Sequence, residues 1–237
     1  MIGAAVYQGF IPWDDDIDLM MTREEYDRFL EVYPQNCSPR YHLLHYSTGD
    51  VTKVPALFAR VEDLWTQTEE EIARRVRQGR VFVDITVFDE VPSRIRLRLL
   101  RLYAGYTCTF LYRMNGMIPG TGWKRMLMGL LPGKVSEKRL RERYLRFEKT
   151  CRNAGKDCRL CAELLSAAYG DILYDRRIFE AYTDILFEGE KLMIVEKYRD
   201  YLFMRYHRTD FPKELPEERR QKSHILSMKI VHDSEEE

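Results

Sequence analysis

The sequence predicts an α+β protein, and three observations along the chain support this class. Residues 16–20 alternate acidic and apolar side chains, which is the period of a half-buried strand. Thr22 and Glu25 then have the spacing of a capping box, and the apolar residues that follow predict a helix. Residues 81–88 are rich in β-branched and aromatic side chains, which favours a strand, and residues 93–150 have a mostly helical pattern.

The remaining elements follow from turn-forming residues and periodicity. Residues 1–13 predict a helix end, a turn at Gly9 and a strand that opens at Pro12, and Pro34 is expected to end the first full helix. Glycine and proline near 116–122 and 132–133 are expected to interrupt the helical region. Further predicted elements are strands at 42–46 and 54–61, a charged helix at 69–78 ended by Gly79, a helix at 158–170, a hairpin at 185–195 turning at Gly189, a helix at 198–207, and a disordered acidic tail at 227–237.

Composition indicates a folded chain with no overall electrostatic preference for nucleic acid. The chain has 237 residues, 45% of them hydrophobic and 32% charged, and its formal net charge is +0. No signal peptide and no apolar stretch of membrane-spanning length is recognisable, and the five cysteines are an odd number. We therefore predict a reducing, cytoplasmic setting, in which Cys151, Cys158 and Cys161 are ordinary thiols rather than part of a zinc site.

An acidic cluster occupies residues 14–18. Because side chains alternate along a strand, Asp16 and Asp18 project from one face, and Asp14 can join them. Two carboxylates that project side by side repel one another unless a divalent cation lies between them. Hard oxygen ligands of this kind suit Mg²⁺ or Mn²⁺. A metal held by carboxylates beside a nucleotide is the apparatus of phosphoryl and nucleotidyl transfer.

A third carboxylate is expected from the strand at 81–88. Asp84 is the one charged residue in that strand, and burying it unpaired would be costly, so it requires a metal ion or a basic group beside it. Asp89 follows the same strand and is expected to cap the next turn. The sequence therefore predicts a divalent-metal site formed by Asp16, Asp18 and Asp84.

Two other interpretations of the acidic cluster are compatible with the residues. A charge run can be a solvated turn, although the apolar flanks and the entry through Pro12 and Trp13 weigh against one. A calcium loop would place the three aspartates and Glu25 at ligand positions, but Leu19 stands where such a loop needs glycine. For the arginines at 94–101, a solvated helix face is the default, and contact with an anionic membrane or a diphosphate is the alternative.

A long motif at residues 9–18, Gly-Phe-Ile-Pro-Trp-Asp-Asp-Asp-Ile-Asp, resembles the signature of the LicD family, which includes the fukutin-related proteins. Residues 21–26 continue that signature, and residues 82–85 resemble the second acidic strand of the family. The segment that begins with Arg60-Val61-Glu62-Asp63 is similar to the segment between them. The resemblance covers residues 1–92 and, through a closing block, residues 185–226, whereas residues 93–184 carry no family motif.

The resemblance implies a nucleotidyltransferase fold similar to DNA polymerase β: a short mixed sheet flanked by helices. The domain would span residues 1–226, with 93–184 as a helical insertion or extension. The implied reaction transfers phosphocholine, or a similar phospho-alcohol, from CDP-choline or a related nucleotide donor to a cell-surface glycan such as lipopolysaccharide or teichoic acid. Asp16 and Asp18 would be metal ligands, and Asp84 would be the third catalytic carboxylate, which binds metal or accepts a proton. We expect this reaction in the cytoplasm, with peripheral association at the inner face of the membrane.

Donor binding is assigned to Arg60 and Trp13. Arg60 is a candidate ligand for the nucleotide phosphates, together with the basic cluster at 74–80. Trp13 is one of several aromatic residues that could surround the quaternary ammonium of choline. The other candidates are Tyr46, Trp65, Tyr198, Tyr201 and Tyr206.

Two departures from the family pattern support a rival interpretation. The family carries a glycine-rich turn at a helix N-terminus, whose N–H groups hold the phosphates, and Met1 aligns just after that turn. Val6 stands where the family tends to have arginine. The rival interpretation is a non-catalytic remnant, or an N-terminally truncated gene product, that binds metal without transferase activity.

Overall fold

The computed structural model describes residues 1–49, 57–72, 75–114, 136–155, 157–164, 171–220 and 223–231. The chain forms two compact units, each assembled from segments that are far apart in sequence. Unit 1 contains residues 1–17, 63–82 and 174–237, and unit 2 contains residues 18–62 and 83–173. The chain therefore passes from one unit to the other inside the acidic cluster, between Ile17 and Asp18.

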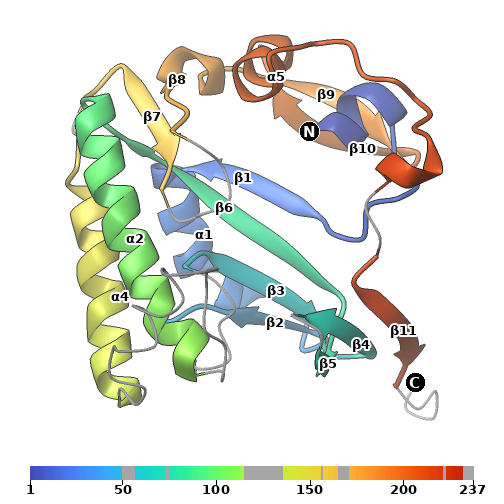
Figure 1. The fold of residues 1–237 in the computed structure, drawn as a ribbon, viewed down its shortest axis with the longest axis horizontal. Coiled ribbons are helices and arrows are strands. Elements are labelled where there is room, and N and C mark those ends of the chain that lie inside the picture. Colours follow the sequence, from blue (N-terminus) through green and yellow to red (C-terminus); the bar gives the residue numbers. More distant parts are fainter. Residues whose placement is uncertain are drawn as a thin grey trace. The chain divides into compact units, whose positions relative to one another are not determined.

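A mixed sheet forms the centre of unit 2 (Figure 1). Its long strand β6 (Phe82–Glu90) runs parallel to β1 (Asp18–Thr22) and antiparallel to β7 (Leu160–Glu163). β3 (Ala59–Asp63) lies beside β6, and β2 (Tyr41–Leu44) lies beyond β3. Six consecutive residues of β6, from Asp84 to Asp89, are buried, and the apolar ones among them are Ile85, Val87 and Phe88.

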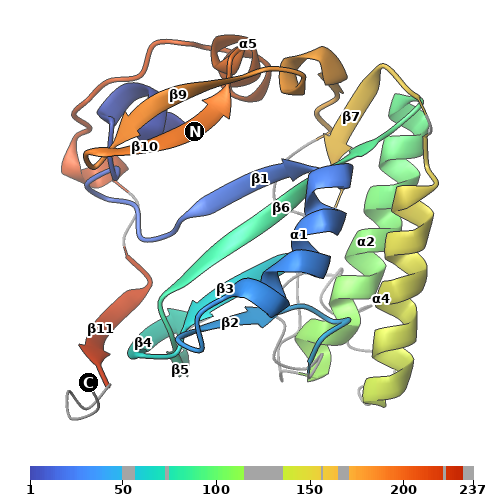
Figure 2. The ribbon, with the colours of Figure 1, turned by 180° about the vertical axis from the view of Figure 1, so that it is seen from behind.

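Three helices of the described residues pack against this sheet. α1 (Arg23–Asn36) begins at the predicted capping box, in which Thr22 Oγ1 accepts the Glu25 N–H and the Glu25 carboxylate accepts the Thr22 N–H. α2 (Arg94–Met114) and α4 (Glu137–Arg152) lie side by side in both views (Figures 1 and 2). One core joins the helices to the sheet, and its members include Tyr26, Ile85, Val87, Leu97, Leu100, Leu140, Tyr144 and Phe147.

Unit 1 contains two small antiparallel sheets and several short helices. β9 (Tyr182–Phe187) and β10 (Glu190–Val195) form the predicted hairpin, and Gly189 adopts a φ of 87° in its turn. The helix α5 (Tyr198–Tyr206) is also as predicted. The second sheet has the order β11 (Ile225–Ile230), β4 (Thr66–Ile72), β5 (Arg75–Gly79). The shorter elements are η1 (Gly3–Tyr7), β8 (Tyr174–Asp175), η2 (Arg176–Phe179) and η3 (Glu217–Arg219).

The charged helix predicted at 69–78 is wrong, because this segment forms the β4–β5 hairpin. Its opposite charges meet across the strands instead of along a helix: Glu70 lies opposite Arg77. The side chain of Gln78 adds hydrogen bonds across the strands to Gln67 (2.7 Å) and Glu69 (3.0 Å). Residues 69–78 are mostly charged or polar, so they have no apolar period that distinguishes a helix from a strand.

The helix predicted at 158–170 is wrong over its described part, because Leu160–Glu163 forms β7. Cys161, Ala162 and Leu164 are all buried there, and a short run of buried residues has no period that separates strand from helix. Several predictions fall outside the described residues. They are residues 54–56 of the strand at 54–61, the interruptions at 116–122 and 132–133, residues 165–170, and the end of the tail at 232–237.

Three further boundaries differ from the prediction. Pro34 lies inside α1, which continues for two residues to Asn36 although a proline at this position cannot donate to the Leu30 carbonyl. Pro12 opens a turn closed by the Asp14 N–H to the Ile11 carbonyl, and the strand begins later, at Asp18. The predicted disorder at 227–230 is wrong, since these residues pair with β4.

Candidate functional site

Asp18 and Asp84 are direct neighbours on parallel strands of unit 2, with their Cα atoms in register. Ile85 and Val87 of β6 lie in the core, so Asp84 points to the opposite face of the sheet. Paired residues of parallel strands project to the same side, so Asp18 faces the same way. Asp18 is exposed at the start of β1, whereas Asp84 retains 9% exposure.

Arg60 completes a row on this face. Its neighbours Ala59 and Val61 contact the core, so Arg60 on β3 also faces away from it. The guanidinium donates two hydrogen bonds to Asp84, from Nε to Oδ1 (2.6 Å) and from Nη2 to Oδ2 (2.9 Å). This bidentate pair supplies the basic partner that a nearly buried aspartate requires. We call Asp18, Asp84 and Arg60 the polar row.

The rest of the acidic cluster belongs to unit 1. Asp14 and Asp16 are exposed and alternate with less exposed neighbours, as the strand-like period predicted. Asp15 has a structural role: its Oδ2 accepts hydrogen bonds from Ser223 Oγ (2.8 Å) and from the His224 N–H at the start of β11. Partial burial acts to raise the pKa of Asp15, but these hydrogen bonds outweigh it and lower the pKa below its usual value.

Trp13, the predicted choline ligand, contacts other residues of unit 1. Its ring lies edge-on to Tyr7, with centroids 6.0 Å apart, and the Arg220 guanidinium lies 5.1 Å from its centroid. The ring face therefore already accommodates a cation. Trp13 is half-buried, so part of the ring remains open to solvent.

The two segments that resemble the LicD family meet in unit 1. Phe10 donates its N–H to Glu188 Oε1 (2.9 Å), and the rings of Phe10 and Phe187 lie 5.0 Å apart. A Cβ at position 9 would collide with the Glu188 carboxylate, which would then have to move away from the Phe10 N–H. The closing block therefore supports the backbone that leads into the acidic cluster.

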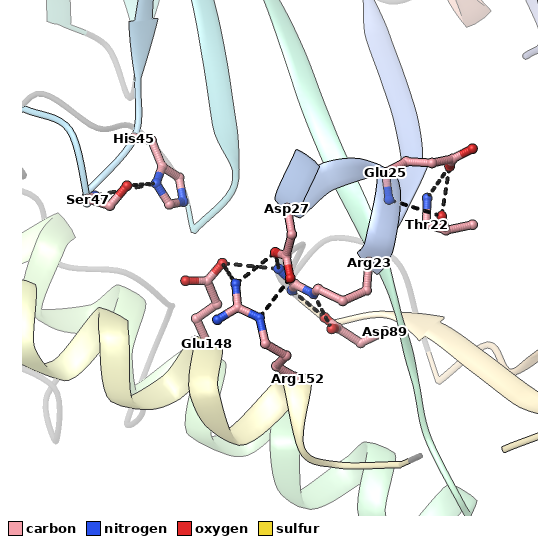
Figure 3. A network of polar contacts seen from close by, with 9 residues as sticks. All are labelled: Thr22, Arg23, Glu25, Asp27, His45, Ser47, Asp89, Glu148 and Arg152. Atoms are coloured by element: carbon pink, nitrogen blue, oxygen red, sulfur yellow. Dashed lines mark hydrogen bonds and ion pairs between the residues drawn. The ribbon is translucent and has the colours of Figure 1, made fainter. Parts of the chain in front are cut away.

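A buried ion-pair network in unit 2 was not predicted (Figure 3). Arg23 chelates Asp89, from Nε to Oδ1 (2.7 Å) and from Nη2 to Oδ2 (2.9 Å), and its Nη1 reaches Glu148 (3.0 Å). Asp27 bonds both Arg23 (3.2 Å) and Arg152 (2.7 Å). Asp89 therefore anchors α1 to the sheet instead of capping a turn, and burial raises its pKa although Arg23 opposes the shift.

A histidine and aromatic residues lie beside this network. The rings of His45 and Tyr46 are tilted by 38°, with centroids 4.0 Å apart. His45 Nδ1 lies 2.6 Å from Ser47 Oγ (Figure 3). Among the described residues, His45 Nε2 has no hydrogen-bond partner. Burial lowers the pKa of His45 to about 4; Glu148 opposes this shift and Arg23 adds to it, so the ring is neutral near pH 7.

The other residues predicted to bind the donor are divided between the two units. Tyr46 is buried in unit 2, and Tyr201 is buried in unit 1, where it stacks on Tyr174 at 5.2 Å. Arg80, from the basic cluster, donates to the carbonyls of Leu64 and Thr66. The cysteines are free thiols, with Cys151 and Cys161 buried, and no group of three potential metal ligands forms within the described part of the chain.

The chemistry of the polar row fits Mg²⁺ or Mn²⁺. These ions prefer carboxylate oxygens and are often bound by one or two carboxylates, with substrate phosphates and water completing the shell. Asp18 and Asp84 are such a pair, and the described structure brings them together on adjacent strands. Asp16 as a third ligand stays a prediction, because it belongs to the other unit.

Fold and site together define a class: an α+β protein whose mixed sheet carries, on the face away from its core, two neighbouring aspartates suited to a divalent cation. Residues 1–95 match the LicD/FKTN/FKRP nucleotidyltransferase domain family. The chain therefore carries a LicD-family segment, which contains the whole acidic cluster, Arg60 and Asp84. No solved structure matches the chain, so the nucleotidyltransferase fold stays a prediction.

The lipopolysaccharide cholinephosphotransferase LicD of Haemophilus influenzae (strain Rd) is similar to this segment. The two are 34% identical over 97 residues, which are 41% of this chain and 35% of that protein. The chain thus matches about a third of the length of this relative. Within the described residues, no helix is both long and apolar enough to cross a bilayer.

Proposed function

We propose that this protein transfers phosphocholine, or a similar phospho-alcohol, from a CDP-linked donor to a cell-surface glycan, in a reaction that depends on a divalent metal. The observation that carries the proposal is the pairing of Asp18 with Asp84 inside the LicD-family segment. The relative from Haemophilus influenzae is named for cholinephosphate transfer to lipopolysaccharide, which supports the choice of donor and acceptor class.

Asp18 and Asp84 would hold Mg²⁺ or Mn²⁺, which supplies electrostatic stabilisation of the donor's diphosphate. In the transfer, a glycan hydroxyl attacks the phosphorus of phosphocholine, the phosphoanhydride bond breaks, and CMP leaves with the bonding electrons. Asp84 would bind the metal or accept the proton of the attacking hydroxyl. Arg60 would stabilise the negative charge of the diphosphate, because its fork of donors suits phosphate as well as carboxylate.

Trp13 is assigned to the choline group of the donor. A quaternary ammonium binds to aromatic faces, and the Arg220 guanidinium already lies over this ring. Choline would take the place of Arg220, or bind beside it. Trp13→Ala should therefore raise KM for CDP-choline more than it lowers kcat, while binding of free CMP should change little.

The test is a panel of nucleotide donors assayed for release of the nucleoside monophosphate in the presence of Mn²⁺ and a glycan acceptor. CDP-choline, CDP-ribitol and UDP-sugars are the donors to compare. We expect CMP release from CDP-choline, and its loss in Asp18→Asn and Asp84→Asn. Asp210→Asn is the matched control, since that side chain is 92% exposed and lies outside the polar row. UMP release without CMP release would contradict the proposal.

A further inference from the structure

The helix α2 presents an apolar stripe to solvent. Ile95, Leu99, Leu102 and Tyr106 are 73%, 54%, 72% and 43% exposed. Their spacings of four, three and four residues keep them within roughly 60° of arc on the helix surface. The opposite side of the same helix supplies Leu97, Leu100 and Ala104 to the core of unit 2. A helix that has already buried one apolar face does not need a second one for folding.

Basic residues border the stripe on both sides. Arg94, Arg96 and Arg98 lie along the first turns, and the helix contains no acidic residue. Arg101 follows, but its side chain is 15% exposed and donates to the Glu163 carbonyl. Asp171 is the acidic partner found for them in the described structure, at 2.8 Å from Arg98 and 3.9 Å from Arg101. On α4, Arg143 lies 4.7 Å from the ring centroid of Tyr106 and extends the basic border to the neighbouring helix.

We propose that this surface, formed by the apolar stripe and its arginines, docks onto a membrane that contains anionic phospholipids. A helix with an apolar face and basic flanks lies in the plane of the interface, with its apolar side chains among the acyl chains and its guanidinium groups against the phosphates. A second copy of the chain fits less well, because pairing two α2 helices would bring their arginines together with no acid on either helix.

The experiment measures co-sedimentation of the full chain with two kinds of vesicle: phosphatidylcholine alone, and phosphatidylcholine mixed with phosphatidylglycerol. We expect binding to the mixed vesicles that weakens with added salt, and little binding to phosphatidylcholine. Leu99→Glu combined with Leu102→Glu should abolish it. Arg96→Gln combined with Arg98→Gln should weaken binding by roughly thirtyfold, because each arginine near an anionic surface strengthens binding by about fivefold.

Two control variants match these changes elsewhere on the surface. Met193→Glu places an acid at an apolar position that is 74% exposed, and Lys191→Gln with Lys213→Gln removes two other positive charges. Both should bind vesicles like the unmodified chain, and all variants should show cooperative thermal unfolding. Equal binding by the Leu99/Leu102 variant, or no binding to mixed vesicles, would overturn the proposal. Loss of a dimer in that variant, measured by light scattering without vesicles, would instead identify a second copy as the occupant.

Discussion

Arg60 and Asp84, on the adjacent strands β3 and β6, form a bidentate ion pair with hydrogen bonds of 2.6 and 2.9 Å. Asp84 also lies in register with Asp18, so the guanidinium partly offsets the repulsion between two neighbouring carboxylates. The pair gives both carboxylate oxygens of Asp84 a hydrogen-bond donor in the middle of a buried strand.

The first prediction concerns the stability that this pair provides. Arg60→Met should lower the free energy of unfolding by about 3 kcal/mol, because it leaves a nearly buried carboxylate unpaired. Asp84→Asn in the same background should restore part of that loss. The measurement is urea unfolding of the two single variants and the double variant. Strictly additive effects would show that the ion pair contributes nothing as a pair.

The second prediction separates two neighbours in the acidic cluster. Asp15 holds Ser223 and the His224 N–H, so Asp15→Asn should increase hydrogen exchange in β11 while Mn²⁺ binding stays unchanged. Asp16→Asn should instead weaken Mn²⁺ binding and leave hydrogen exchange in β11 unchanged. Because the pKa of Asp15 is lowered, its contribution to stability is complete at neutral pH and is lost as the pH falls below about 4. Weakened Mn²⁺ binding in Asp15→Asn would refute this division of roles.

The third prediction concerns the buried His45. Its pKa is lowered to about 4 in the folded protein, so between pH 6.5 and 4 the unfolded chain binds a proton that the folded chain does not. Stability should therefore fall as the pH is lowered through this window, by about 2 kcal/mol between pH 7 and pH 5. The charged groups that act on His45 are Glu148, Arg23, Arg152 and Asp27.

The variant His45→Phe provides the comparison, since it keeps a ring between Tyr26 and Tyr46 and cannot titrate. Urea unfolding at both pH values should show a smaller loss for this variant than for the unmodified chain. Identical pH dependence in the two proteins would mean that the carboxylates of the network, and not His45, cause the effect.

The local elements could be predicted because their signals are local. The capping box of Thr22 and Glu25 and the hairpin turn at Gly189 each need only a few adjacent residues. The strand containing Asp84 was also recognisable, because residues 81–88 are all β-branched or aromatic apart from Asp84. The hairpin at 66–79 was not, since its stabilising contacts join residues such as Glu70 and Arg77 across two strands.

Long-range partners could not be predicted from one sequence. Arg23 and Glu148 are 125 positions apart, and no periodicity indicates that they meet. The face of Arg60 could have been predicted, because Ala59 and Val61 bracket it with apolar residues, but its pairing with Asp84 could not. The binding of the donor's phosphates by Arg60 stays a prediction.

The fourth prediction concerns how much of the chain the family segment needs for folding. Residues 1–95 match the LicD family, but the core around Tyr26 and Ile85 also includes Leu100, Leu140 and Phe147 from α2 and α4. A fragment of residues 1–95 should therefore lack a cooperative thermal transition, whereas the full chain shows one. Circular dichroism with heating is the measurement, and a cooperative transition in the fragment would show that α2 and α4 are dispensable.

The metal site is tested most directly by titration of Mn²⁺, followed by the loss of the electron paramagnetic resonance signal of the free ion. The unmodified chain and Asp210→Asn should bind with the same affinity, since Asp210 lies outside the polar row. Asp18→Asn and Asp84→Asn should each weaken binding by roughly tenfold or more, because each removes one of two paired carboxylate ligands. Unchanged affinity in both variants, with their folds intact, would contradict the assignment of the polar row as the metal site.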